Sequence, residues 1–220
     1  LQTLSARYDT DLKAQADSAA LVLAMQTLST TQASSPGDLK PLIQSARSLI
    51  TTVGNQSNLI LDPDLDSYYS MSLVVLRFPE LVEVLNETAL AVEHKRQSSS
   101  ATRALSSTAL LILAGRLDAI HQAITADYKQ AYAAGSKAFR DQLLDHQQAL
   151  DRQIVQLLSM VQSFAEQDIP ATDLRLFVLM RHQALAALGD AWGSSSAALG
   201  ELLQARVQGQ EGVGQRRPLV

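Results

Sequence analysis

The stretch QLLDHQQALDRQIVQLLSMVQSF, residues 142–164, decides the fold class of this chain. Its apolar side chains recur every seven residues on two companion positions: Leu143, Leu150, Leu157 and Phe164 on the first, Ile154 and Val161 on the second. Such a repeat forms one apolar stripe along an α-helix, and the stripe is buried by packing against other helices. The stretch therefore predicts a long helix in a bundle.

A second seam follows after the turn DIPATD, residues 168–173. Spacings of four and three alternate along it, through Leu174, Val178, Arg181, Leu185, Leu188, Trp192, Ser195, Leu199 and Leu202. Arg181 occupies a position where a leucine is expected. A buried cation needs a counter-charge, so this residue is a candidate for function.

The composition agrees with a helical protein. Hydrophobic residues make up 46% of the 220 residues but aromatic residues only 5%, with 10 glycines and 6 prolines. Few turn residues favour long helices over a sheet. The net charge of −4 comes without a basic patch, so we expect no nucleic-acid partner. The absence of cysteine excludes disulfides and thiolate chemistry.

We predict an all-α, elongated up-down bundle that forms one domain over residues 1–220, as a single bundle or as two stacked four-helix bundles. The six expected helices cover residues 2–33, 38–61, 63–96, 100–133, 136–167 and 170–208. Six antiparallel traverses place both termini at one end. The longest apolar run, residues 109–114, is far shorter than the roughly 20 residues of a membrane span, so we expect no such span here. We interpret the chain, from Leu1 to the closing QRRPLV, as a segment of a longer protein.

The run LDPDLDSYYSM, residues 61–71, looks at first like a metal-binding loop. Counted from Asp62, an EF-hand would need glycine and glutamate where Ser67 and Leu73 stand, so calcium is not expected. The aspartates instead predict a helix start, with Asp62 as the cap, Pro63 at the first helical position and Asp64 and Asp66 in the first turn. Likewise, Asp38 is expected to cap the second helix, with Pro41 in its first turn.

With these helices in place, the chain resembles the all-helical extracytoplasmic sensor domains of bacterial histidine kinases and chemoreceptors, and in particular the helical bimodular sensors. The resemblance is strongest at LDPDLDSYYSM and at LRFPELVEVL, residues 76–85, and the closing LLQARVQGQEGVGQRRPLV is similar to the run before a second membrane helix. Ser72 stands where these sensors commonly carry an acidic residue.

The resemblance implies a periplasmic domain of an inner-membrane protein, held between two transmembrane helices in a homodimer. It further implies that a small molecule, often an organic anion, binds between helices and shifts a terminal helix. Among such receptors, a sensor histidine kinase is the expected full-length protein. The domain itself is expected to perform no catalysis and to hold no cofactor.

Four residues are candidates for the ligand site: Arg181, Arg77, Tyr68 and Tyr69. Each has a structural alternative. An aspartate could neutralise Arg181, or its side chain could reach water. Arg77 precedes an expected kink at Pro79 but could form a surface ion pair, and one tyrosine could serve packing alone.

Other chemistry has no visible residue set. The histidines, His94, His121, His146 and His182, show no metal-ligand spacing, and no nucleophile elbow or phosphate loop is present. A structural or protein-interaction bundle that docks a periplasmic binding protein remains the alternative function. A lipid-binding helical protein is disfavoured by the sparse aromatic residues.

Overall fold

The computed structural model describes residues 2–30, 35–57, 59 and 64–214, and in these ranges it contains helices and no strand. The predicted all-α fold class is confirmed. In chain order the elements are α1 (Gln2–Tyr8), α2 (Gln15–Thr30), the 3₁₀ turn η1 (Pro36–Leu39), α3 (Lys40–Gln56), α4 (Leu65–Met71), the π-helical segment η3 (Ser72–Arg77), α5 (Phe78–Gln97), α6 (Arg103–Ala134), α7 (Lys137–Glu166) and α8 (Ala171–Gly214).

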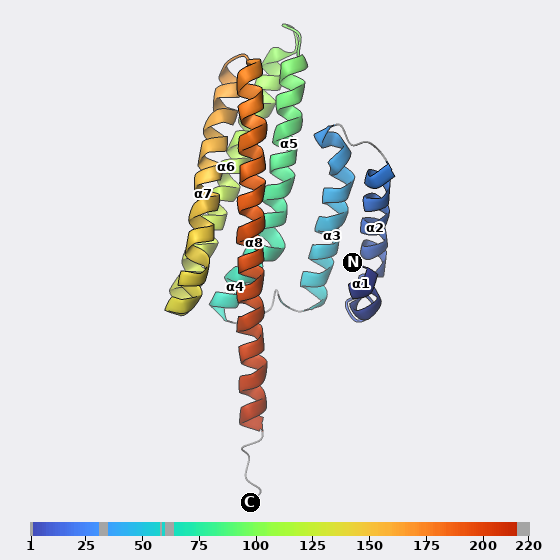
Figure 1. Ribbon diagram of the computed structural model, residues 1–220, viewed down its shortest axis with the longest axis vertical. Helices are drawn as coiled ribbons and strands as arrows, with labels where there is room; N and C mark the ends of the chain where they lie inside the picture. Colours follow the sequence, from blue (N-terminus) through green and yellow to red (C-terminus); the bar gives the residue numbers. More distant parts are fainter. Residues whose placement is uncertain (1, 31–34, 58, 60–63, 215–220) are drawn as a thin grey trace, which may run out of the picture.

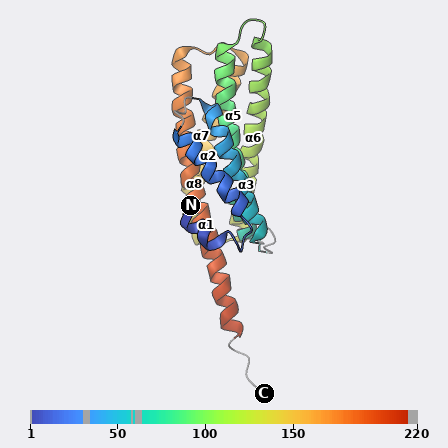
Figure 2. The ribbon, with the colours of Figure 1, turned by 90° about the vertical axis from the view of Figure 1, so that its right-hand side faces the viewer.

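The described residues form one four-helix bundle with a helical hairpin at its side. α4, η3 and α5 follow one another as a single arm, which packs with α6, α7 and α8 in an up-down-up-down arrangement (Figure 1). The α2–α3 hairpin lies alongside α5 (Figures 1 and 2). The predicted alternative of two stacked four-helix bundles is therefore wrong, because the hairpin lies beside the bundle and not beyond its end. α8 continues beyond the bundle at the end where the N-terminus also lies (Figure 1), as the antiparallel traverses predict.

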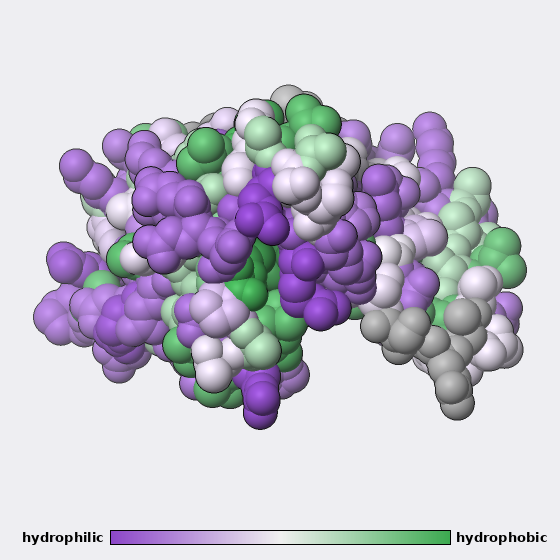
Figure 3. Space-filling model, turned by 90° about the horizontal axis from the view of Figure 1, so that it is seen from above, coloured by the Kyte–Doolittle hydropathy of each residue, from purple (hydrophilic) through white to green (hydrophobic). Residues whose placement is uncertain are grey.

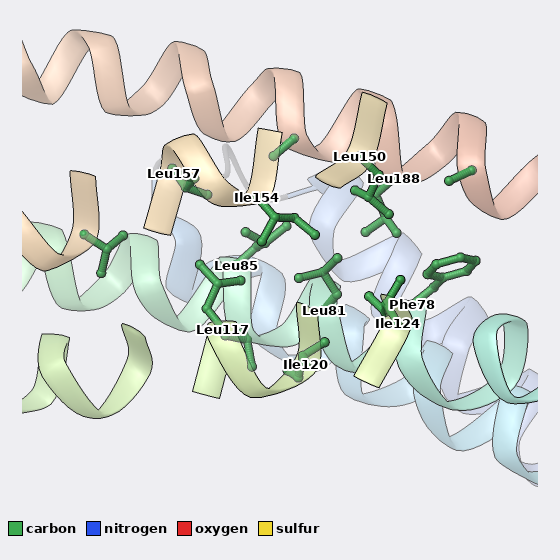
Figure 4. Close-up of a cluster of buried hydrophobic side chains, with 14 of the residues drawn as sticks. Phe78, Leu81, Leu85, Leu117, Ile120, Ile124, Leu150, Ile154, Leu157 and Leu188 are labelled. Carbon is green, nitrogen blue, oxygen red and sulfur yellow. The ribbon is translucent and has the colours of Figure 1, made fainter. Parts of the chain in front are cut away.

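The core runs along the bundle axis. Side chains from all four helices meet there, among them Phe78 and Leu81 of α5, Ile124 of α6, Ile154 of α7 and Leu188 of α8 (Figure 4). All six seam residues predicted for α7 are buried, with exposed fractions of 3% or less. The heptad prediction for this helix is confirmed.

The seam predicted for α8 is partly wrong. Leu188, Ser195 and Leu199 are buried, but Val178 is 59% exposed. Four residues that each directly precede a residue of the predicted seam are buried: Phe177, Ala184, Ala191 and Ala198. Alanines allow a helix to approach its neighbours closely, so they occupy the interior while the bulkier residues next to them flank it.

The first predicted helix, 2–33, is interrupted between Tyr8 and Gln15. Lys13 adopts a left-handed conformation with φ of 50°, which an α-helix does not accept. The carboxylate of Asp9 accepts hydrogen bonds from the hydroxyls of Ser5 and Ser18, the latter at 2.9 Å. Short polar side chains compete in this way with the helical backbone pattern.

Polar contacts hold the hairpin together and join it to the bundle. Asp17 of α2 accepts hydrogen bonds from Ser48 (2.7 Å) and Thr52 (2.6 Å) of α3, which lower the pKa of its carboxyl. Arg47 of α3 forms an ion pair with Glu83 of α5. The hairpin is therefore tied to α5 as well as folded on itself.

The start of the second predicted helix differs from the expectation. Ser35 is the N-cap of η1, and its hydroxyl accepts from the Gly37 N–H at 3.0 Å. Asp38 accepts from the Ser35 N–H at 2.9 Å, which completes a capping box. Asp38 therefore belongs to the cap without being the N-cap itself, while Pro41 lies in the first turn of α3 as expected.

A buried lysine, Lys95, binds the C-terminal end of α7. Lys95 is 6% exposed, and its ammonium donates to Ser107 Oγ and Ala165 O, both at 2.9 Å, and to Phe164 O. Burial lowers the pKa of this ammonium. The two carbonyls belong to the last turn of α7, so Lys95 serves as a C-terminal cap supplied by another helix.

By length and composition, α6 alone among the described helices could cross a membrane. The expectation from the longest apolar run did not include it. A third of its most apolar stretch of 18 residues is buried within the bundle. The buried side chains of α6 include Leu110, Leu117 and Ile124.

Candidate ligand-binding site

Asp64 and Asp66, the described aspartates of the acidic run, have a partner that the sequence did not indicate. α4 begins at Leu65 with Asp64 at the N-cap position and Asp66 in the first turn, while Asp62 and Pro63 lie outside the described residues. Arg206 of α8 contacts Asp64 at 2.9 Å and Asp66 at 2.8 Å. The prediction that Asp66 lies in the first turn is confirmed, whereas the prediction for Asp64 is wrong: it is the N-cap residue, because the helix begins at Leu65. Both aspartates also anchor α8 where it leaves the bundle.

The helix widens just before Pro79. The Phe78 N–H donates to the carbonyl of Leu73, five residues back, in place of the usual four. Proline has no N–H, and its ring crowds the carbonyl four residues earlier, here that of Val75. The interruption expected at Pro79 is thus present as the π-helical segment η3, a feature often found at functional sites.

η3 carries a polar cluster that faces α6. Asp127 is 7% exposed and accepts from Ser72 Oγ at 2.7 Å and from Arg77 Nε at 3.0 Å. Arg77 therefore has an aspartate partner, as the ion-pair alternative expects, although the pair lies between helices and not on the open surface. Ser72, the departure from the sensor pattern, helps to satisfy this buried carboxylate.

The two tyrosines share neither environment nor role. Their rings meet edge to face, with centroids 5.2 Å apart. Tyr68 is 39% exposed, whereas Tyr69 packs against the main core. The expectation that only one of the pair faces the core agrees with this arrangement.

Arg181 lines a pocket of about 250 Å³ between α5 and α8, at the point where η1 reaches the bundle. We call it the Arg181 pocket. Its walls are Pro36 from η1, Ala89, Val92, Glu93 and Arg96 from α5, and Leu174, Phe177, Val178 and Arg181 from α8.

The guanidinium of Arg181 is held by neutral groups. Its Nε donates to the carbonyl of Leu85 at 3.3 Å, and its Nη2 lies 3.5 Å from Oδ1 of Asn86. Asn86 is 3% exposed and donates in turn to the carbonyl of Pro36 at 2.9 Å. The arginine is therefore oriented by a buried amide that also fixes the hairpin.

No acidic side chain forms an ion pair with Arg181 within the described part of the chain. Burial lowers the pKa of its guanidinium, which means that the charged form is poorly solvated there. Arg96 and Glu93 lie on the same walls, so the two arginines outnumber the one glutamate. The pocket carries a net positive charge and suits a small anion.

The four predicted site residues do not come together. Arg77 precedes Leu85 by eight residues, about 12 Å along the helix, and it pairs with Asp127. Tyr68 and Tyr69 lie further still toward the start of the arm, in α4. Asn86, Arg96 and Phe177 were missed, because their role depends on which faces of α5 and α8 meet.

Comparison with known proteins gives no match among family models, curated proteins or solved structures. The fold defines the class, an all-α up-down bundle with a flanking hairpin. The resemblance to bacterial sensor domains stays a prediction from the sequence.

Proposed function

We propose that this chain is the extracytoplasmic input domain of a transmembrane signalling receptor, in first place a sensor histidine kinase, and that it binds a small anion in the Arg181 pocket. The observation that carries the proposal is a partly buried arginine without an acidic partner among the described residues, on the wall of a pocket between two helices. A free anion would supply the missing counter-charge.

The position of the pocket suggests how binding is transmitted. α8 supplies Arg181 and then runs past the bundle, at the end where the N-terminus lies (Figure 1). A ligand that contacts α5 and α8 together favours one packing of these helices over another. It shifts the equilibrium between the two packings by its difference in affinity for them, and the extended end of α8 carries the change toward the membrane.

The experiment is a thermal-shift and calorimetric screen with organic acids, amino acids and nitrate. Arg181→Met keeps the aliphatic stem but removes the charge, and the exposed Arg175→Ala on the same helix is the matched control. Loss of a charge-assisted contact costs about 1.5–3 kcal/mol, so we expect Arg181→Met to weaken binding roughly ten- to hundredfold. The free variant should be as stable as the parent or more so, because it no longer buries an unneutralised cation.

A protein-interaction bundle is the second candidate, and the hairpin favours it. A recess of about 540 Å³ between α2 and α3 is lined mostly by apolar side chains, including Leu28 and Leu42. Leu23 is 64% exposed and Met25 50%, and hydrophobic residues surface on the hairpin at the right of Figure 3. A screen in which no anion binds, or in which Arg181→Met binds every anion of the screen as tightly as the parent, would reject the sensor site and leave this candidate.

A further inference from the structure

The groove between α6 and α7 holds a second cavity, separate from the Arg181 pocket. Its volume is about 400 Å³, and its walls include Lys129 and Tyr132 of α6 and Arg140, Leu144 and Gln147 of α7. The Arg181 pocket is formed by η1, α5 and α8 instead. The two cavities share no residue and no helix.

Two lining residues bury an oxygen that has no hydrogen-bond partner in the described part of the chain: Tyr132 through its hydroxyl and Gln147 through Oε1. The amide nitrogen of Gln147 contacts Asp151 Oδ2 at 3.4 Å, which leaves the oxygen as the free end. Burial raises the pKa of the Tyr132 hydroxyl, so it stays protonated and can donate. Native proteins rarely leave such atoms unpaired, and two in the lining of one cavity point to a missing partner.

The same cavity is positively charged. Lys129 and Arg140 line it, and neither forms an ion pair with a described residue. The Arg140 guanidinium lies over the ring of Tyr132, 5.8 Å from its centroid. An anion at the mouth of the cavity would meet both cations.

We propose that this cavity binds a small carboxylate that carries a hydrogen-bond donor on the adjacent carbon, a 2-hydroxy or 2-amino acid. The carboxylate pairs with Lys129 and Arg140 and accepts from the Tyr132 hydroxyl. Gln147 Oε1 can only accept, so the ligand must supply an O–H or N–H to it. A plain carboxylate satisfies the first requirement and fails the second.

Both oxygens are buried, so a ligand reaches them only when neighbouring side chains move. Arg140 is exposed and lies over the face of the Tyr132 ring, so its displacement toward the ligand carboxylate opens that face of the ring to the ligand. This movement costs little, because an exposed arginine side chain samples several rotamers. The helical backbones of α6 and α7 stay in place.

The test is calorimetry on the whole chain with lactate and L-alanine against propionate, which has the same three-carbon skeleton without the donor. The panel extends from glycolate and glycine to malate and glutamate. We expect lactate or L-alanine to bind about tenfold or more tightly than propionate. Tyr132→Phe and Gln147→Leu should each weaken that binding about tenfold or more, while the exposed neighbour Gln148→Leu changes nothing.

Two further measurements distinguish ligand binding at this cavity from a purely structural role of Tyr132 and from binding in the Arg181 pocket. Tyr132→Phe removes an unpaired hydroxyl, so the free variant should unfold at the same denaturant concentration as the parent or higher. In the Arg181→Met variant, which lacks the charge of the Arg181 pocket, lactate and L-alanine should still bind, and adding Tyr132→Phe should still weaken that binding about tenfold or more. The proposal is overturned if no 2-hydroxy or 2-amino acid binds, if propionate binds as well as lactate, or if binding depends on Arg181 and not on Tyr132 and Gln147.

Discussion

Arg206 of α8 donates from Nη2 to Oδ1 of Asp66, the first-turn aspartate of α4, at 2.8 Å. Asp66 lies where the arm of α4 and α5 begins, and Arg206 lies close to the last described side chain of α8. Leu199 and Leu203 pack nearby with Met71 and Val75. Beyond this contact α8 leaves the bundle, so the pair fixes the exit point of the helix that we propose transmits the signal.

Arg206→Ala should lower the free energy of unfolding by about 1–2 kcal/mol, since the contact is charge-assisted and only partly exposed. Arg206 and Asp66 side chains are 28% and 20% exposed. Chemical denaturation gives the free energy, and hydrogen exchange should become faster in the last turns of α8. As a control, Lys137→Ala breaks an exposed pair with Asp141 and should change stability by less than about 0.5 kcal/mol. If both variants behave alike, the Arg206 contact does not anchor α8.

Arg77 and Asp127 should respond unequally to loss of the partner. Arg77→Met leaves Asp127, whose side chain is 10% exposed, with Ser72 as its remaining partner. A buried carboxylate without its cation costs about 3 kcal/mol or more. Asp127→Ala leaves Arg77, whose side chain is 34% exposed and can turn to water, so the cost should be nearer 1–2 kcal/mol. Equal losses in urea titrations of the two variants would show that exposure does not govern this pair.

The α7 seam could be predicted because every interior position holds a large apolar side chain. α8 could not be predicted as well, because Ala184, Ala191 and Ala198 fill its interior line while bulkier residues stand beside them. Alanine is common both inside and on the surface of helical bundles, so its position in a sequence does not show which face of a helix is buried. Its burial follows from how closely two helices approach, which only the assembled bundle determines.

The candidate site could be predicted only in part, for a similar reason. Arg181 was identified because a cation on an apolar seam is conspicuous in one helix taken alone. Asn86 and Arg96 carry no such signal, since their role depends on the pairing of α5 with α8. The contact of Arg206 with Asp66 spans 140 residues of sequence, and no local pattern reports a contact at that separation.

Gly54 marks a close approach between the hairpin and the bundle. A Cβ at this position would lie 2.8 Å from Cγ1 of Val75 in η3. Val75 is buried and β-branched, so it cannot easily turn away. We expect Gly54→Ala to destabilise the protein by about 1 kcal/mol, because overpacking exceeds the gain in helix propensity.

Gly189 provides the matched comparison for Gly54. It lies in α8, and a Cβ there would meet nothing within 4 Å. Gly189→Ala should therefore stabilise the protein by about 0.5–1 kcal/mol through helix propensity alone. Thermal melts of the two variants should shift in opposite directions, and a shift of the same sign in both would argue against the close contact of α3 with η3.

The buried hydroxyl of Tyr128 should make the free energy of unfolding depend on pH in alkaline solution. Its hydroxyl lies 2.9 Å from Ser195 Oγ in the core, and burial raises its pKa from 10.0 to about 12. The unfolded chain therefore loses this proton first as the pH rises. The stability that Tyr128 contributes is complete below about pH 10 and is lost between about pH 10 and pH 12. A shift of this size corresponds to about 2–3 kcal/mol.

Tyr128→Phe isolates that contribution, because phenylalanine keeps the ring and does not titrate. The difference in unfolding free energy between parent and variant should be constant below about pH 10 and should shrink as the pH rises toward 12. Tyr132, whose pKa burial and the neighbouring Tyr128 both raise, also contributes to the pH dependence. Because Tyr128→Phe changes the titration of Tyr132, parent and variant are compared with Tyr132→Phe present in both. Tyr68→Phe removes an exposed hydroxyl and is the control. A difference that stays constant up to pH 12 would mean that the Tyr128 hydroxyl titrates alike in the folded and unfolded chains.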